Sequence, residues 1–170
     1  MAEGWPSGEN ADEALERLVK EYQGTLLRFC YAELHDAALA EDAVQETFLK
    51  VYKNWSSFRG ESGEQTWLMR IAVNTCRDFL RSAWFRHTDR RITPEMLPLH
   101  AAQATDEQEE LALAIANLPR KYREAILLYY YQDMTVEETA GVLGLAQSSV
   151  SNRLKKGRET LRKMLERGDS

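Results

Sequence analysis

The sequence predicts an all-α protein of two small helical domains joined by a flexible linker. Apolar residues recur with the helical period of about 3.6 along most of the chain, and no stretch alternates as a strand does. Between residues 86 and 105 this period is lost, and Pro94 and Pro98 lie in the gap. A connection of about 20 residues is longer than a compact domain usually contains, so the gap separates two domains.

The first domain is expected at residues 12–85, after a disordered N-terminus at residues 1–11. Its predicted helices run from Asp12 to about Leu34, from Ala38 to about Trp55, and from Thr66 to about Phe85. The second helix has an apolar face that we expect to pack inward, made of Val44, Phe48, Val51, Tyr52 and Trp55. The loop before the third helix is rich in serine and glycine.

The second domain is expected at residues 106–167 and ends in a helix-turn-helix. Its first two predicted helices are Asp106–Asn117 and Arg120–Tyr131, the latter burying Ile126, Leu127 and Tyr130. Thr135 and Glu138 then form a capping box that begins a short helix, and Gly144 suits the left-handed turn that ends it. The next helix carries an apolar stripe of Val150, Leu154, Leu161 and Leu165.

The last helix has the charge of a DNA-binding helix. Between Gln147 and Arg167 there are seven basic and two acidic residues, in a chain whose net charge is −5. Phosphate contacts supply most non-specific DNA affinity, and a local basic stripe is their usual sign. Any helical hairpin has a turn and an amphipathic second helix, so it is the charge that favours DNA binding over a purely structural hairpin.

The first domain is divided by charge. Residues 1–69 carry six basic and thirteen acidic side chains, whereas residues 70–91 carry six basic and two acidic ones. The first segment suits a basic partner and the second an acidic one. On the second helix, Asp42, Gln45, Glu46 and Leu49 share one face, which is either simply solvated or a surface that docks on a basic helix.

Nothing in the sequence indicates an enzyme, a metal centre or a cofactor. The three histidines lack carboxylates or cysteines at metal-ligand spacing, and no phosphate-binding loop is present. Cys30 and Cys76 are too few for a disulfide framework or a zinc site. No apolar run approaches the roughly 20 residues of a membrane span, and the polar N-terminus is unlike a signal peptide. A cytoplasmic location is expected.

Three ordered motifs resemble the extracytoplasmic-function sigma factors of bacterial RNA polymerase. They are AEDAVQETFLKVY (Ala40–Tyr52), SFRGESGEQTWLMRIAVNTCRDFLR (Ser57–Arg81), and LPRKYREAILLYYYQDMTVEETAGVLGLAQSSVSNRLKKGRETL (Leu118–Leu161). The resemblance covers about residues 15–85 and 108–166. It implies that the first domain is sigma region 2 and the second sigma region 4, and that the chain guides core polymerase to a promoter and helps to open the duplex.

The resemblance also implies site residues in region 2. The residues implied to dock on the β′ clamp helices of core polymerase are Asp42, Gln45, Glu46, Phe48 and Leu49. The residues implied to bind the −10 element and capture a flipped base are Phe58, Arg59, Arg70, Asn74 and Arg77. Flipping costs a few kcal/mol of stacking, which contacts in a pocket must offset.

In region 4, the residues implied to bind the −35 element are Ser148, Ser149, Ser151, Asn152, Arg153, Lys155 and Lys156. Family members often have a basic residue in place of Ser151 and alanine in place of Gly157, a glycine that costs about 1 kcal/mol of helix stability. The implied partners are the β′ clamp helices and β flap of core polymerase, promoter DNA, and an anti-sigma factor, which in this family is often membrane-bound.

Two alternatives compete with this interpretation. A free-standing helix-turn-helix regulator of the response-regulator output type would explain Thr135–Arg158, but not the helix at Ala38–Trp55. An anti-sigma or adaptor protein would use residues 1–85 for protein contact alone. Binding to DNA with and without core polymerase distinguishes these classes.

Overall fold

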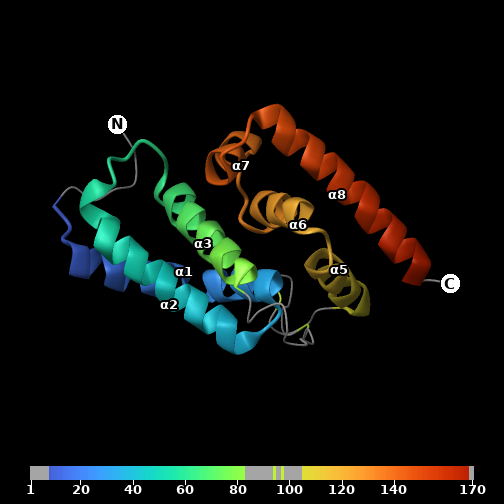
Figure 1. The fold of residues 1–170 in the computed structure, drawn as a ribbon, viewed down its shortest axis with the longest axis horizontal. Helices are drawn as coiled ribbons and strands as arrows, with labels where there is room; N and C mark the ends of the chain where they lie inside the picture. The colour runs from blue at the N-terminus through green and yellow to red at the C-terminus, as the bar shows by residue number, and fades with distance from the viewer. Residues whose placement is uncertain (1–7, 83–93, 95–96, 98–104, 169–170) are drawn as a thin grey trace.

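The computed structural model describes residues 8–82, 94, 97 and 105–168, and this part of the chain is helical and contains no strand. The first group of elements, here called the N-terminal bundle, is α1 (Ala11–Leu34), α2 (Ala37–Asn54), the 3-10 turn η1 (Trp55–Ser57) and α3 (Glu64–Arg81). The second, the C-terminal bundle, is α5 (Asp106–Ala116), α6 (Arg120–Ile126), the π-helical turn η3 (Leu127–Tyr131), α7 (Val136–Leu143) and α8 (Gln147–Gly168). Figure 1 shows the two bundles side by side, with α3 facing α6 and α7. The predicted fold class is confirmed.

The N-terminal bundle is built on the antiparallel pair α1 and α2, against which α3 packs. The turn between α1 and α2 is tight because His35 adopts a left-handed conformation (φ 59°) and Asp36 immediately caps α2 through the backbone N–H of Leu39. The core contains the fully buried Phe29 of α1 and Leu68 of α3. Cys30 and Cys76 also lie in it as free thiols, with their Sγ atoms 3.6 Å apart.

Side-chain caps fix where several helices begin. The capping box of Thr135 and Glu138 is present, as predicted, and Gly144 ends α7 in the left-handed region (φ 67°). Asn10 and Glu13 form a second box, so α1 begins at Ala11, within the segment expected to be disordered. Residues 1–7 lie outside the described part of the chain, as does most of the predicted linker.

Two expected core residues prove to be exposed. Tyr52 was expected on the inward face of α2, yet it is 43% exposed, because Val44, Phe48 and Val51 fill that face and Tyr52 lies on its flank. Tyr130 is 46% exposed because a π-helical turn interrupts the 3.6-residue period: Gln132 N–H bonds to the Leu127 carbonyl five residues earlier. The turn rotates Tyr130 outward, where its hydroxyl accepts a hydrogen bond from Arg158.

The C-terminal bundle packs α6 closely on α8 at Gly157. A Cβ atom at this position would lie 3.1 Å from Cγ1 and 3.3 Å from Cδ1 of Ile126, which is buried and β-branched. The glycine therefore permits a close helix approach, which offsets its low helix propensity. None of the described helices is long and apolar enough to cross a membrane.

This packing predicts opposite results for two glycine substitutions. Gly157→Ala should lower the free energy of unfolding by up to about 2 kcal/mol, because overpacking costs about 1–3 kcal/mol and the propensity gain is about 1 kcal/mol. Gly24→Ala on α1, where nothing lies within 4 Å of the added Cβ, should raise it by about 0.5–1 kcal/mol. Urea unfolding of both variants checks this. Equal stabilisation by the two alanines would contradict the close approach.

Candidate nucleic-acid interface

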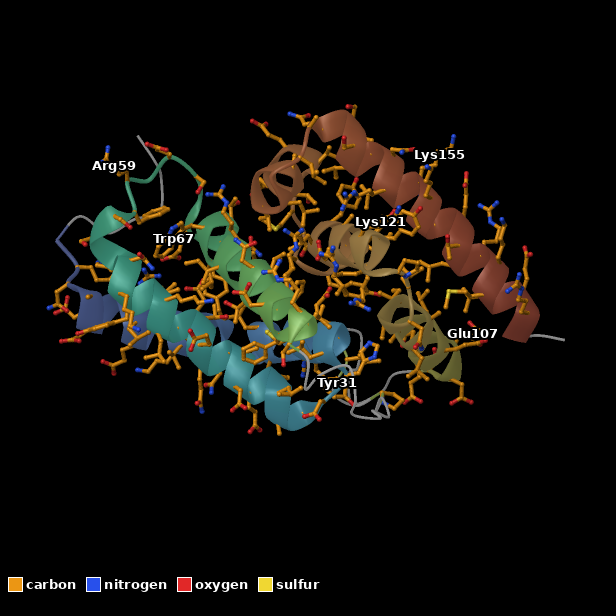
Figure 2. The ribbon with its side chains drawn as sticks, in the orientation of Figure 1. Tyr31, Arg59, Trp67, Glu107, Lys121 and Lys155 are labelled. Carbon is orange, nitrogen blue, oxygen red and sulfur yellow. The ribbon has the colours of Figure 1, made fainter. Side chains whose placement is uncertain are left out.

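The helix-turn-helix of α7 and α8 presents a polar and basic face to solvent. Val150, Leu154 and Leu161 of α8 are buried against the bundle. Of the residues predicted to contact the −35 element, those exposed are Ser148, Ser149, Ser151, Asn152, Lys155 and Lys156. Arg153 is half-buried. Figure 2 shows Lys155 on the outer side of α8, away from the other helices.

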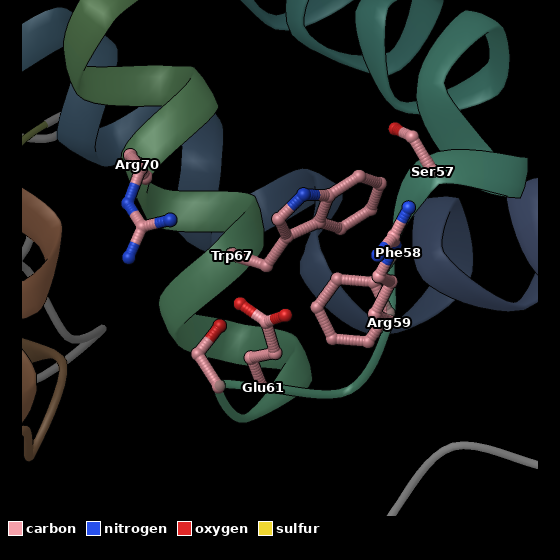
Figure 3. A pocket seen from close by; sticks show the side chains of 7 residues that line it. Ser57, Phe58, Arg59, Glu61, Trp67 and Arg70 are labelled. Carbon is pink, nitrogen blue, oxygen red and sulfur yellow. The ribbon is translucent and has the colours of Figure 1, made fainter.

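An aromatic hollow lies between the loop after η1 and the start of α3. It measures about 310 Å³ and is lined by Ser57, Phe58, Arg59, Glu61, Ser62, Trp67 and Arg70. The Phe58 and Trp67 rings lie 4.7 Å apart at 47°, and both side chains are half-buried (Figure 3). Half-buried aromatic rings beside guanidinium groups can stack on an unpaired base. Trp67, expected to be a core residue, therefore belongs to this hollow as well.

The residues predicted to bind the −10 element occupy two places. Phe58, Arg59 and Arg70 line the aromatic hollow. Asn74 is exposed one turn along α3 from Arg70. Arg77 lies further along the helix and does not join the hollow, since its guanidinium makes a two-point pair with Glu124 of α6.

The residues predicted to dock on core polymerase lie on or beside a groove between α1 and α2. Gln45, Phe48 and Leu49 line this groove of about 600 Å³, together with Leu15, Val19 and Tyr52. Phe48 is buried and Leu49 is 52% exposed. Asp42 is exposed and Glu46 is half-buried.

Sequence reasoning missed the α1 side of this groove. Leu15 and Val19 of α1 were not among the predicted docking residues, and Tyr52 was expected on the inward face of α2. Val44, Phe48 and Val51 already fill one face of the helix and leave Tyr52 outside it. Their spacing was the sequence signal that indicated an exposed Tyr52. Asp12 hydrogen-bonds to Tyr52 and raises the pKa of its hydroxyl.

The two bundles contact each other directly along a surface here called the seam, where α3 packs on α7 and α1 meets α5 and α6. Arg70 Nε donates to the carbonyl of Gly141 at 3.1 Å, and Gln65 Nε2 donates to the carbonyl of Gln132 at 3.0 Å. His35 Nε2 donates to the carbonyl of Ala116 at 2.8 Å. We call this arrangement, in which the two bundles are in contact, closed. Its contacts engage Arg70 and Arg77, two of the residues predicted to bind the −10 element.

Charged groups are buried at the seam. Glu33 of α1 is 2% exposed and accepts a hydrogen bond from Arg123 of α6 at 3.0 Å. Arg123, 7% exposed, also donates to the carbonyls of Ala116 and Leu118. Burial raises the pKa of Glu33 above its ordinary value of 4.5, and the nearby positive charge of Arg123 opposes this only in part. When the two bundles are in contact, the carboxylate of Glu33 therefore lies in a poorly solvated site.

Among the described residues, no group of three or more histidine, cysteine, aspartate or glutamate side chains could hold a metal ion. Cys76 is buried, and its hydrogen bond with Cys30, together with burial, raises the pKa of its thiol well above the ordinary value. A protonated, buried thiol is a poor nucleophile and a poor ligand.

Comparison with known proteins bears on both bundles. A model of Sigma-70 region 2 matches residues 18–86, and a model of Sigma-70, region 4 matches residues 108–161. The ECF RNA polymerase sigma factor SigW of Bacillus subtilis is 30% identical over 167 residues, with 90% of this chain and 89% of the relative covered. The chain belongs to the extracytoplasmic-function sigma factors of the sigma-70 family. The predicted resemblance is confirmed.

Other relatives agree with this assignment. The RNA polymerase sigma-H factor of Pseudomonas aeruginosa is 31% identical over 167 residues, with 90% of this chain and 86% of the relative covered. The solved structure of CnrH in complex with the cytosolic domain of CnrY is 27% identical with a TM-score of 0.72, and the match covers 96% of this chain and 93% of that chain. The sigma factor RpoE of Bartonella quintana, solved with the anti-sigma factor NepR, shares the fold at 21% identity and a TM-score of 0.77.

Sigma factors are transcription initiation factors, and regions 2 and 4 together provide promoter recognition. This sigma factor therefore directs promoter-specific initiation by RNA polymerase. A response-regulator output domain would not account for the region 2 match, and an anti-sigma or adaptor protein would not account for the region 4 match. Both alternatives are set aside.

The buried Glu33 makes the stability of the closed sigma factor depend on pH. Because folding raises its pKa above 4.5, its contribution is fully present below pH 4.5 and is lost as pH rises through the folded pKa. Below pH 4.5 the Glu33→Gln variant and the parent protein should have the same free energy of unfolding. Above pH 4.5 the variant should become progressively more stable than the parent. Urea titrations across pH check this, with exposed Glu41→Gln as the matched charge control. A difference independent of pH would contradict the burial argument.

Proposed function

We propose that region 2, at residues 12–85, holds core polymerase and captures the −10 strand, and that region 4, at residues 106–167, reads the −35 duplex. Residues 86–105 connect the two. The observation that carries the proposal is the separation of three distinct surfaces: an apolar groove, an aromatic–basic hollow and an exposed basic helix. Each suits one partner, respectively a helical protein surface, an unpaired base and a duplex.

In the core-docking surface, Leu49 supplies apolar contact, while Asp42 and Glu46 complement a basic helix. Gln45 and Phe48 complete the groove wall. A largely apolar groove with acidic residues nearby fits the β′ clamp helices, while region 4 meets the β flap. Charge complementarity here chiefly selects the partner and speeds association.

In the −10 surface, Phe58 and Trp67 offer stacking faces for a flipped base, with Arg59 and Arg70 beside them for phosphates. Asn74 can donate to a base edge. Arg70 and Arg77 are engaged across the seam, so the bundles must move apart before these arginines reach DNA. Core polymerase, which holds the two regions at promoter spacing, would drive that opening.

In the −35 surface, Ser151, Asn152, Lys155 and Lys156 would face base edges in the major groove, with Ser148 beside them. Ser149 and Arg153 would contact phosphates. The sigma factor carries no catalytic group of its own in this proposal, since the polymerase performs nucleotide transfer. It acts in the cytoplasm.

An anti-sigma factor is the third proposed partner. CnrH was solved with the cytosolic domain of CnrY, and RpoE of Bartonella quintana with the anti-sigma factor NepR. An anti-sigma factor that competes with core polymerase would cover the apolar groove beside Leu49. A membrane-bound anti-sigma factor would receive its inducing signal from outside the cytoplasm.

Reconstituted transcription tests the proposal as a whole. Purified full-length chain with core polymerase should give defined start sites on genomic DNA, while the chain alone should bind duplex only weakly. Mapping those start sites identifies the −35 and −10 elements. Tight binding to a palindromic duplex without core polymerase would contradict the proposed division of labour.

Asp42→Arg should weaken core binding about tenfold or more, because it places a positive charge against a basic partner surface. Its fold should be unchanged, since the side chain is exposed. Glu41→Arg, exposed one residue earlier and on a different face, is the matched control. Fluorescence anisotropy with labelled chain measures both affinities. Equal loss in the two variants would remove Asp42 from the docking surface.

Lys155→Ala with Lys156→Ala should reduce −35-dependent transcription and lower the salt dependence of promoter binding by up to about two charges. Arg162→Ala with Lys163→Ala removes the same charge two turns later on α8, where both side chains are exposed. This control should have the smaller effect. Promoter binding measured at several salt concentrations gives the slopes, and an unchanged slope would remove the lysines from the interface.

A further inference from the structure

A second hollow opens at the seam, and it shares Arg77 with the proposed −10 surface and Arg153 with the proposed −35 surface. It measures about 450 Å³ and receives positively charged side chains from three helices. They are Arg77 and Arg81 of α3, Arg120 and Lys121 of α6, and Arg153 of α8. Figure 2 shows Lys121 on α6. Because both bundles contribute, the complete hollow exists only when they are closed.

The positive charge in this hollow is only partly neutralised. The buried carboxylate of Glu124 pairs with both Arg77 and Arg120, and Asp78 pairs with Arg81. Among the described residues, no carboxylate lies within 4 Å of the charged nitrogens of Lys121 or Arg153. Five cationic groups thus face two carboxylates. Closure brings these like charges together, and a bound anion would relieve their repulsion.

Hydrogen-bond donors remain available as well as charge. A guanidinium has five N–H groups. Arg77 directs Nε at 3.1 Å and Nη2 at 2.7 Å to Glu124, and Arg120 directs Nη1 at 2.8 Å to the same carboxylate. Glu124 therefore holds both arginines at the hollow while leaving most of their donors unused. Guanidinium groups fixed in this way suit phosphate oxygens, which accept paired hydrogen bonds.

We propose that the closed sigma factor binds a small polyphosphate anion in this hollow, of the class of inorganic tripolyphosphate or a nucleoside triphosphate. The volume lies in the range of small-molecule sites. Several separate cations match several linked phosphates better than a single sulfate or phosphate. Leu143 and Leu145 form an apolar wall on which the base and sugar of a nucleotide can lie.

The position of the hollow favours a small anion over duplex DNA. It is recessed between two bundles, whereas a duplex presents its phosphates on a convex surface. Binding to the closed form alone would stabilise closure by mass action. If the proposed function holds, such an anion would keep Arg70 and Arg77 engaged at the seam and reduce promoter use, but binding itself does not depend on that function.

Calorimetric titration of the free full-length chain tests the proposal, without polymerase or promoter. Tripolyphosphate and guanosine triphosphate are the two probes, and sulfate at equal ionic strength is the reference. Both probes should bind, and Arg81→Ala with Lys121→Ala should weaken their binding about tenfold, as expected for the loss of two contacts made by exposed charges. Arg28→Ala with Lys53→Ala removes two exposed charges from α1 and α2 and should leave affinity unchanged.

The two probes and the variants distinguish the possible results. Tighter binding of the nucleotide than of tripolyphosphate assigns Leu143 and Leu145 to the base, and equal binding assigns the site to the phosphates alone. Slower hydrogen exchange in α3 and α7 on binding would support closure. No binding beyond sulfate, equal losses in the control pair, or displacement of tripolyphosphate by a short duplex would overturn the proposal. Arg153→Ala provides an independent variant if the double variant unfolds.

Discussion

The carboxylate of Glu124 connects the two regions of this sigma factor. It lies buried at the seam and holds Arg77 of region 2 in a two-point pair while it also binds Arg120 of its own helix. Breaking a buried pair by removing one partner costs about 3–5 kcal/mol. The engagement of Arg77 and the shape of the cationic hollow depend on this group, since it fixes α3 against α6.

The second buried pair, Glu33 with Arg123, also joins the two bundles at the seam, but burial weakens it. Arg123 is supported by the carbonyls of Ala116 and Leu118, whereas burial disfavours the charged form of Glu33. A buried pair of this kind adds little net stability but specifies one geometry. The seam is therefore specific without being strongly held, which suits the proposed separation of the two regions on core polymerase.

The two regions use their surfaces differently because their local folds differ. In region 2 a groove and an aromatic hollow arise where loops and helix flanks leave side chains half-buried, as at Trp67, or exposed, as at Tyr52. In region 4 the recognition helix is packed on one face only, at Val150 and Leu154, and the opposite face is polar throughout. Close packing at Gly157 brings α8 against α6, so the polar face is held rigidly outward.

The sequence by itself determined the helical class, the helix-turn-helix with its Thr135–Glu138 cap and Gly144 turn, and the exposure of the α8 polar face. These features depend on local spacing and capping, which neighbouring residues decide. It did not determine the outward rotation of Tyr130, because a π-helical turn changes the period, nor the exposure of Tyr52. Only the tertiary structure decided that Arg77 meets Glu124, 47 residues away, and that five cations gather in one hollow. Such contacts depend on how the two bundles pack on each other, and no local pattern encodes that.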